Sequence, residues 1–509
     1  MGKDAVAASY QEIPYPALPR VETQPAHLAA LGTLLGLRPA PPTACRVLEL
    51  GCSDGGNLLS AACLAPDSEF VGVDLAPDHV AAAEATCGEL GLTNVRFLAG
   101  DVLELPLDEE RFDYVIAHGL YSWVAAPIRA RILDLCAAVL APQGIACVSY
   151  KTYPGWHLRE LTRGLLRFAG RSASAAPERL ARGRELLAFV DAAVSRERSP
   201  VYAEMLAHQR RELEHAPDAY VFHDFLEATS APCYFHEFAA QAASHGLQYV
   251  TDARYLLTRP ENFLGGSSLA RVRRLSADPI ELEQHVDLLT NRSFRWSLLC
   301  RPEVELTREP GVAQLERLHF ASCLTADPGA SPSDDGAVSF RGPPGGIRVA
   351  APAAQRAFAA LAEAWPRSLP WSQLAGDDPT GVAADALEAH AAGLIDLHAA
   401  PLPVVASASE RPRASPYARL TAARGGPVLN VRQEVVEAGE LGRKLLPHLD
   451  GDHDHQALAR VAAALAASGA VTLPGPTGAP LQPALAAQAI GQGVTPFLDQ
   501  LARAGVLLG

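Results

Sequence analysis

The sequence predicts an α/β fold in which a parallel sheet is followed by a helical insertion and a C-terminal α+β region. Between residues 45 and 150, short apolar runs of β-forming residues alternate with helical stretches. Strands separated by helices of about 10 to 15 residues indicate βαβ units and a parallel sheet. The strands are near-continuous apolar runs, as expected when helices cover both faces of a sheet.

The elements of this sheet can be placed in order along the chain. The expected strands are Cys45–Leu50, Glu69–Asp74, Val95–Leu98, Phe112–Ala117 and Ile145–Tyr150. The expected helices between them are Gly56–Leu64, Asp78–Leu90 and Pro127–Leu140. A further helix–strand pair follows at residues 232–255, where Gly246 stands at the position of a helix C-cap glycine. Leu247–Thr251 would then be a further strand that closes the sheet.

The rest of the chain divides into helical and small α+β parts. Residues 156–231 and 278–320 are expected to be helical, and Ala326–Gly346 is the best linker candidate because it is rich in Pro, Gly, Ser and Asp. Leu387–Leu397 and Leu498–Gly509 share one ending, a helix, a glycine and a short apolar strand. This weak repeat predicts two winged-helix-like modules. The expected domains are 1–160 with 233–257, the insertion 161–232, a helical middle region 258–325, and modules at 338–405 and 415–509.

Composition and charge exclude several classes of protein. The 509 residues correspond to roughly three domains. The formal net charge of −14 argues against a nucleic-acid partner bound by neutralising phosphates, but it leaves open a cationic partner such as a basic peptide. The nine cysteines include no Cys-x-x-Cys pair, which favours a reducing cytoplasm over a disulfide framework. Neither a signal peptide nor a membrane-spanning segment is expected.

One polar run, Asp450–His455, has the residue types of a metal site. It reads DGDHDH and lies between two expected helices. We expect a solvated turn there and no metal.

The stretch Val47–Asn57, VLELGCSDGGN, carries the chemistry. An apolar strand enters a glycine turn and a helix follows. Such a turn lets the backbone approach a ligand closely, and the helix N-terminus offers free N–H groups. Asp74 ends the next strand, 23 residues after Gly51, where a carboxylate can accept hydrogen bonds from ribose hydroxyls.

Two cofactor classes compete for this turn. A dinucleotide fingerprint counted from Gly51 requires glycine at position 53, which is Ser53. Glu49 precedes the turn, and Gly100-Asp101 follows the third strand, where a carboxylate can accept from an adenine amino group. In this order and spacing the features fit S-adenosylmethionine, which has no pyrophosphate to bind.

The order of elements resembles the class I methyltransferases, with their Rossmann-like sheet. More narrowly, the chain resembles bacterial methyltransferases with a methyltransferase regulatory domain, which include the rickettsial-type protein lysine methyltransferases. The resemblance covers roughly residues 9–301, about 60% of the chain. It is carried by Ser9-Tyr10, Pro14-Tyr15-Pro16, LELGCSDGGNLL, EFVGVDLAP, FDYVIAHGLYSWV, SYKTYPGWHLR, CYFHEFAAQAASHGLQYV and NRSFRWSLLCR. Ser53 departs from the G-x-G-x-G turn of the class.

The resemblance implies site residues position by position. The residues that it places at S-adenosylmethionine, with S-adenosylhomocysteine as product, are Tyr10, Glu49, Gly51, Ser53, Asn57, Asp74, Leu75, Asp101, Val102, Ala117 and His118. The candidate catalytic residues are His118, Tyr121, Tyr153 and Tyr15. Core packing is an equally good reading of any one of Tyr121, Trp123, Tyr153, Trp156 and His157, but as a group we expect some to line the substrate entrance.

The implied reaction is in-line displacement of a methyl group from sulfur by a nucleophile, most plausibly a lysine amine of a protein or peptide. Deprotonating that amine at pH 7.4 costs about 4 kcal/mol, because the ordinary pKa of a lysine side chain is about 10.4. The cationic sulfur of S-adenosylmethionine, about 5 Å from the amine, repels its charged form by roughly 3 kcal/mol at an effective dielectric of about 20, and this repulsion offsets most of the cost of deprotonation. We therefore predict that no single side chain is an essential general base.

Two other functions share the same cofactor residues. A small-molecule or biosynthetic-intermediate methyltransferase could use the extra domains as lids or dimer contacts. A protein that senses S-adenosylmethionine with little turnover would also keep Asp74 and Asp101. The chain length favours a large acceptor, because a small-molecule enzyme needs only about 250 residues. The sequence leaves the acceptor atom, the number of methyl groups and the oligomeric state open.

Overall fold

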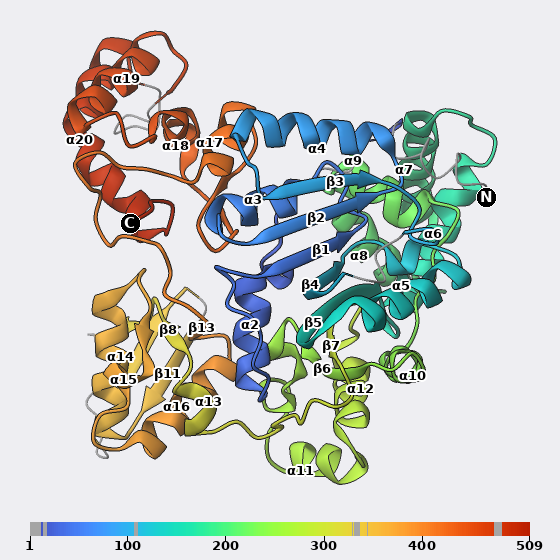
Figure 1. Ribbon diagram of the computed structural model, residues 1–509. Helices are drawn as coiled ribbons and strands as arrows, with labels where there is room; N and C mark the ends of the chain where they lie inside the picture. Colours follow the sequence, from blue (N-terminus) through green and yellow to red (C-terminus); the bar gives the residue numbers. More distant parts are fainter. Residues whose placement is uncertain are drawn as a thin grey trace.

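The structure is a computed structural model that describes residues 12–13, 18–105, 110–327, 329, 336–343, 345–472 and 481–509. Its centre is a seven-stranded sheet in the order β3-β2-β1-β4-β5-β7-β6 (Figure 1). The strands are β1 (Arg46–Leu50), β2 (Glu69–Asp74), β3 (Val95–Ala99), β4 (Phe112–Ala117), β5 (Leu140–Lys151), β6 (Gln248–Asp252) and β7 (Phe294–Cys300). The first five are parallel, and β7 runs antiparallel to both β5 and β6.

Helices cover both faces of this sheet, as the continuous apolar strands predict. They are α2 (Pro25–Leu34), α3 (Gly56–Leu64), α4 (Pro77–Leu90), α5 (Ala126–Val139), α10 (Phe235–Ser244) and α12 (Pro279–Thr290). The buried residues form two apolar clusters that contain different side chains of the same strands: Val47 belongs to one and Leu48 to the other. Of the expected elements, Glu69–Asp74, Phe112–Ala117 and Gly56–Leu64 are found with the same bounds.

The expectation of continuous helix at 278–320 is wrong. Helix α12 is present, but Phe294–Cys300 is the strand β7, inserted between β5 and β6. The expected closing strand is indeed at the sheet edge, as β6. Residues 294–300 are nearly all buried, so the segment lacks the exposed polar face by which a strand at a surface is recognised.

A helical insertion follows β5. It comprises α6 (Gly155–Gly170), α7 (Ala176–Ala193), α8 (Pro200–Glu214), α9 (Asp218–Val221) and the π-helical turn η3 (Phe222–Leu226). These helices share an apolar cluster of their own that includes Leu166, Leu206 and Phe225. In Figure 1 they lie on the right, beside the end of the sheet where the site is found.

The C-terminal half forms two smaller units at the left of Figure 1. The first contains β8 (His319–Ala321), β9 (Thr325–Ala326), β10 (Val338–Gly342), β11 (Gly345–Val349), α14 (Pro352–Ala364), β12 (Leu369–Pro370), α15 (Trp371–Leu374), α16 (Pro379–Ala391) and β13 (Asp396–His398). The second contains α17 (Pro416–Ala423), β14 (Val428–Leu429), β15 (Val435–Val436), α18 (Gly439–Leu445), α19 (His455–Ala467) and α20 (Pro483–Arg503). Short elements elsewhere are η1 (Val21–Thr23), η2 (Tyr121–Trp123), η4 (Tyr255–Thr258), η5 (Pro260–Asn262), α11 (Gly266–Leu275), α13 (Val312–Leu315) and η6 (Leu446–His448).

Two expectations about this half can be compared with the structure. Residues 326–346 were expected to form a linker. This is wrong from residue 338 onward, because β10 and β11 pair there as an antiparallel hairpin. The repeated ending is present: Gly393 and Gly505 both follow a helix with φ of 73°. A positive φ is accessible to glycine without steric cost, which explains glycine at both helix ends.

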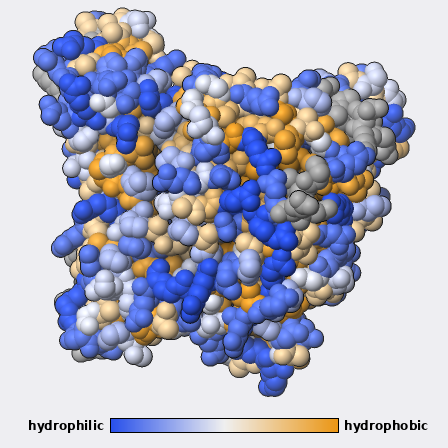
Figure 2. Space-filling view, in the orientation of Figure 1, coloured by the Kyte–Doolittle hydropathy of each residue, from blue (hydrophilic) through white to orange (hydrophobic). Residues whose placement is uncertain are grey.

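The two units pack on the sheet domain through its helices. Helix α2 contacts β13, and α17 contacts α3. Figure 2 shows polar and apolar residues interspersed over the face seen in Figure 1. Within the described residues, no helix is both long and apolar enough to cross a membrane.

Candidate functional site

A cavity of ≈ 450 Å³ lies at the carboxyl ends of β1, β2 and β4. Ligands in open α/β sheets bind at this edge. Among its lining residues are nine of those expected at the cofactor: Glu49, Gly51, Ser53, Asn57, Asp74, Leu75, Asp101, Val102 and His118. The structure thus brings most of the expected cofactor residues together around one space.

The turn after β1 has the backbone that the glycines suggest. Gly51 and Gly55 have φ of 75° and 77°, and Ser53 has φ of 51°. A Cβ atom on Gly55 would lie 2.6 Å from the Phe97 ring, so this position has no room for a side chain. Ser53 therefore replaces the second glycine of the class pattern while keeping a left-handed backbone.

Asp74 holds this turn from the end of β2. Its Oδ2 accepts a hydrogen bond from the Ser53 N–H at 2.8 Å, and its Oδ1 accepts from the Ala76 N–H at 2.9 Å. His79 Nδ1 lies 3.6 Å from Oδ1, and the carboxylate of Asp74 raises the pKa of His79. Asp74 and His79 both line the cavity. The sequence reasoning missed His79, although its place in the first turns of the helix after Asp74 was a usable signal.

Glu49 is a buried carboxyl beside the glycine turn. Its Oε1 accepts from Asn57 Nδ2 at 3.0 Å, and its Oε2 has no hydrogen-bond partner among the described residues. Burial raises the pKa of Glu49 to about 8. A buried polar atom without a partner is costly, so this oxygen fits a donor from a bound ligand. The residues present thus fit a cofactor with a cationic amino group.

Asn57 joins Glu49 to the segment that precedes the sheet. Its Oδ1 accepts hydrogen bonds from the Arg20 N–H at 3.2 Å, from Thr23 Oγ1 at 3.2 Å and from Gln24 Nε2 at 2.8 Å. Asn57 therefore fixes the position of the Glu49 carboxyl relative to η1.

Asp101 and Val102 form the edge of the cavity after β3. Asp101 Oδ1 accepts a hydrogen bond from the Leu103 N–H at 2.9 Å, which shapes the loop. Leu75, after β2, is 37% exposed and contributes an apolar surface nearby. An acidic and apolar edge of this kind fits an adenine ring, whose amino group is a donor.

His118 follows β4 and faces the cavity. Its Nδ1 lies 2.8 Å from Ser149 Oγ, and its ring stacks at 6.2 Å on Trp296. Burial lowers the pKa of His118 to about 4, and the charge of Arg20 acts in the same direction.

Three other expected site residues that the structure describes do not line the cavity. Ala117 is wholly buried in β4 and does not line it. The Tyr121 ring packs in the core against Phe238, and its hydroxyl donates to Gln241 Oε1 at 2.7 Å. Tyr153 stacks on His157 at 4.0 Å, outside the cavity. Neither tyrosine lines the described cavity, and the catalytic role expected of Tyr121 and Tyr153 stays a prediction. Tyr10 and Tyr15 lie outside the described residues.

A second part of the cavity lining, called the aromatic wall here, carries rings and charges of both signs. It comes from η2, the helical insertion, β7 and the segments next to them, and its members are Trp123, Trp156, Arg159, Tyr220, His223, Asp224, Glu227, Arg254, Phe294 and Trp296. Of the expected aromatic group at the substrate entrance, only Trp123 and Trp156 line this wall. Phe294 and Trp296 were missed because β7 was taken as helix, although their alternation with Arg295 and Ser297 was a strand signal.

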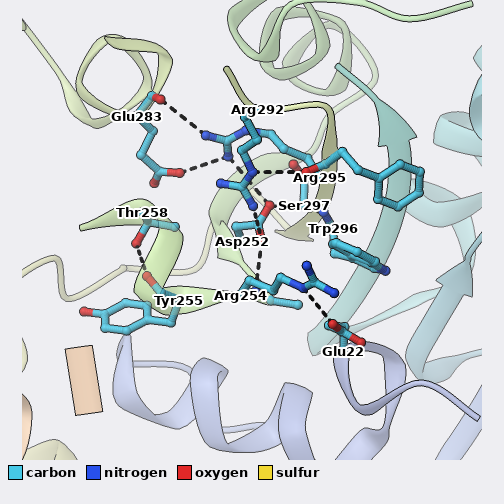
Figure 3. Close-up of polar contacts among 12 residues, drawn as sticks. Glu22, Asp252, Arg254, Tyr255, Thr258, Glu283, Arg292, Arg295, Trp296 and Ser297 are labelled. Atoms are coloured by element: carbon cyan, nitrogen blue, oxygen red, sulfur yellow. Dashed lines mark hydrogen bonds and ion pairs between the residues drawn. The ribbon is translucent and has the colours of Figure 1, made fainter. Parts of the chain in front are cut away.

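Arg254 links this wall to a buried ionic network in the middle region (Figure 3). Its guanidinium lies 4.3 Å from the centre of the Trp296 ring and donates to Glu22 Oε1 at 2.7 Å. Behind it, Arg295 is wholly buried and donates to Asp287 at 2.7 and 2.8 Å and to Glu283 at 3.0 Å. These ion pairs join β7 to α12, so they fix the strand that carries Phe294 and Trp296.

The polar run Asp450–His455 serves local structure far along the chain. Asp450 Oδ1 accepts from the Asp452 N–H at 2.8 Å, and Asp454 caps α19 by accepting from the Ala457 N–H at 2.7 Å. The run is thus a turn and a helix cap, as expected.

Three parts of the chain match described families. Residues 47–144 match a methyltransferase domain, residues 217–301 a predicted methyltransferase regulatory domain, and residues 410–506 the C-terminal winged-helix domain of PKMT. The winged-helix match falls on the second of the two expected modules.

The chain is also similar to individual rickettsial proteins. It is 36% identical over 301 residues to the uncharacterised protein RP789 of Rickettsia prowazekii, covering 59% of this chain and 54% of that protein. It is 34% identical to RP028 of the same organism, covering 46% of this chain and 93% of that protein. The chain thus spans about half the length of RP789.

A solved structure matches nearly the whole chain. PKMT2 from Rickettsia typhi in complex with AdoHcy superposes with a TM-score of 0.84 at 25% identity, covering 97% of this chain and 100% of that one. The match includes both C-terminal units as well as the sheet domain. The chain belongs to the rickettsial-type S-adenosylmethionine-dependent methyltransferases, which carry a methyltransferase regulatory domain and a C-terminal winged-helix domain.

Proposed function

We propose that the protein transfers a methyl group from S-adenosylmethionine, by in-line displacement, to lysine amines of a protein acceptor. The observation that carries this proposal is the composition of the cavity. Its lining combines Glu49, Asp74 and Asp101 at the strand ends with a wall of aromatic and charged residues. The similarity to PKMT2 of Rickettsia typhi supports the same reading.

The cofactor side has a residue for each polar part of the ligand. Bound S-adenosylmethionine supplies a reactive methyl group on a cationic sulfur. Asp74 would accept the ribose hydroxyls and Asp101 the adenine amino group. The unpaired Oε2 of Glu49 would accept from the amino group of the methionine part. The chain's own task is to orient the reacting groups and exclude water.

The acceptor side suits an amine. Ammonium groups are attracted to the faces of tryptophan rings, and the wall contains Trp123, Trp156 and Trp296. Each of these rings already has a cation of the chain, Lys151 or Arg254, over it, so an acceptor ammonium would approach the remaining ring surface. The carboxylate of Glu227 lines the same wall and would favour a cation at the entrance, whereas that of Asp224 is paired with Lys151. Burial within an aromatic wall lowers the pKa of an amine, which helps it to lose a proton before it attacks.

The domains beyond the sheet favour a protein acceptor from the cytoplasm. The regulatory and winged-helix domains add surface that a small substrate does not need. The net charge of −14 steers a basic protein toward the cavity rather than a nucleic acid. All nine cysteines are free thiols, which fits a reducing compartment.

A label-transfer assay tests the proposal. Purified protein is mixed with methyl-labelled cofactor and a lysate of its own organism, and the products are separated by size. Label in a discrete protein band, mapped to lysine by peptide mass spectrometry, is the expected result. Label confined to small molecules would instead favour a small-molecule methyltransferase, and tight cofactor binding without label would favour a sensor.

The matched control is Asp74→Ala, which removes the contacts that hold the cofactor turn. It should give no labelled band under the same conditions. A band that persists with this variant would show that the label comes from a contaminating enzyme.

A further inference from the structure

A buried ammonium lies directly behind the aromatic wall. Lys151 ends β5 and is wholly buried. Its Nζ lies 4.3 Å from the centre of the Trp123 ring and 4.0 Å from that of Trp156. It also donates to the Asp224 carbonyl at 3.1 Å and pairs with Asp224 Oδ1 at 3.3 Å. The ammonium thus has two aromatic neighbours and one carboxylate.

The partners of Lys151 come from three separate parts of the chain. Trp123 belongs to η2, Trp156 to α6 and Asp224 to η3. All three line the cavity, whereas Lys151 does not. The Trp123 Nε1–H donates to the His223 carbonyl at 3.1 Å, which ties η2 to η3 a second time. One buried charge therefore joins the sheet domain to the helical insertion and to the start of the regulatory domain.

A lysine is notable at this position. Of the 43 basic residues in the chain, only Lys3, Lys151 and Lys444 are lysines, and the others are arginines. Burial lowers the pKa of Lys151 to about 8, while Asp224 opposes that shift. A compact ammonium accepts two ring faces and a carboxylate around one point, whereas a planar guanidinium requires a wider arrangement.

We propose that Lys151 is a positioning residue that holds Trp123, Trp156 and Asp224 in the arrangement that receives an alkylammonium acceptor. This inference rests on the proposed function and names the part of the site that recognises the acceptor amine. In it, Lys151 touches neither acceptor nor cofactor. Its ammonium sets the orientation of both tryptophans and neutralises Asp224.

Three variants separate positioning from simple stabilisation. Lys151→Met leaves Asp224 buried without its partner and so also destabilises the fold. The double variant Lys151→Met/Asp224→Asn removes both charges and keeps the fold. Lys151→Arg keeps the charge but changes its shape. Lys444→Met, at an exposed position on α18, is the matched control.

The probe is n-butylammonium chloride, which copies the lysine side chain, with n-butanol as the uncharged match. Binding to the protein loaded with S-adenosylhomocysteine is followed by tryptophan fluorescence. Wild type and Lys444→Met should bind n-butylammonium better than n-butanol. The double variant should keep its unfolding midpoint and its cofactor Kd, yet lose about tenfold in affinity for n-butylammonium, the range of a desolvated cation–π site. The affinity of Lys151→Arg for n-butylammonium should lie between those of wild type and the double variant.

Steady-state kinetics with the labelled acceptor supply the second measurement. The double variant should raise the acceptor KM about tenfold while the cofactor KM stays unchanged. Equal n-butylammonium affinity in wild type and the double variant would overturn the positioning role, as would a parallel loss of cofactor affinity. If lysine labelling fails while the n-butylammonium result holds, the proposed function falls and the positioning role stands.

Discussion

The Nδ1 atom of His118 lies 2.8 Å from the hydroxyl oxygen of Ser149, and this contact decides which ring nitrogen carries hydrogen. The same hydroxyl oxygen accepts the Gly119 N–H at 3.0 Å, and Ser149 is wholly buried. Among the hydrogen-bond partners of Ser149 within the described residues, His118 Nδ1 is the one acceptor for the hydroxyl hydrogen, and buried donors are nearly always paired. Nδ1 therefore accepts, and Nε2 carries the hydrogen of the neutral ring.

This tautomer makes His118 a hydrogen-bond donor rather than a base. His118→Ala should lower kcat/KM by about 10- to 100-fold, the loss of one well-placed donor in a dry site. Because the pKa of His118 is about 4, wild-type activity should show no titration of this residue between pH 5 and 8. A loss above about 10⁴-fold in kcat with cofactor binding unchanged would identify an essential base instead. Ser149→Ala, which frees the tautomer, is the companion variant.

Glu49→Gln should weaken cofactor binding and remove its rise with pH up to about 8. The pKa of Glu49 is raised to about 8 by burial, so its charged fraction grows as the pH rises through that value. A cationic amino group binds the charged form, so wild-type affinity should rise with pH up to about 8 and fall above it, where the α-amino group of the ligand, with an ordinary pKa of about 7.7–8.0, loses its own charge. Isothermal titration from pH 6.5 to 9 measures it, with the exposed Glu69→Gln as the control. A pH profile shared by all three proteins would assign the titration to the ligand's own amine.

Asp74→Asn should reduce cofactor affinity by about 10- to 100-fold, because a charge-assisted hydrogen bond contributes about 1.5–3 kcal/mol. The amide keeps one acceptor but cannot accept on both sides from the Ser53 and Ala76 N–H groups. The variant should also lower the pKa of His79 toward its ordinary value, since the carboxylate that raises it is gone. NMR titration of the His79 ring checks this, and an unchanged pKa would contradict the pairing.

Arg295→Met should destabilise the protein strongly, because it removes the buried guanidinium that donates to Asp287 and Glu283. Figure 3 shows Arg295 beside Glu283. Breaking a buried pair from one side costs about 3–5 kcal/mol. The urea unfolding midpoint should fall well below that of Arg273→Met, whose guanidinium is exposed on α11. Restoring the midpoint with Arg295→Met/Asp287→Leu would confirm the cause, whereas an unchanged midpoint in the single variant would refute it.

The elements of the parallel sheet were predictable because their signals are local. The strand Glu69–Asp74 and the helix Gly56–Leu64 are set by a change of hydrophobic period and by glycine turns. The strand Phe294–Cys300 was not predicted by the same means. Its alternation covers only residues 294–297, and its partners β5 and β6 lie about 150 and 45 residues away in the chain, so the neighbouring sequence did not show that it belongs to this sheet.

The sequence by itself determined the cofactor side of this protein. Glu49 and Asp74 lie near or at the carboxyl ends of β1 and β2, the glycine turn and Asp101 follow β1 and β3, and the carboxyl ends of such parallel strands meet at one edge. Only the tertiary structure decided the acceptor side. Lys151 meets Asp224 across 73 residues, and Trp123 meets the His223 carbonyl across 100. Contacts at that separation depend on how the helical insertion packs against the sheet domain. Tyr121 and Trp123 are two residues apart in η2, yet the fold buries the first in the core and places the second at the cavity.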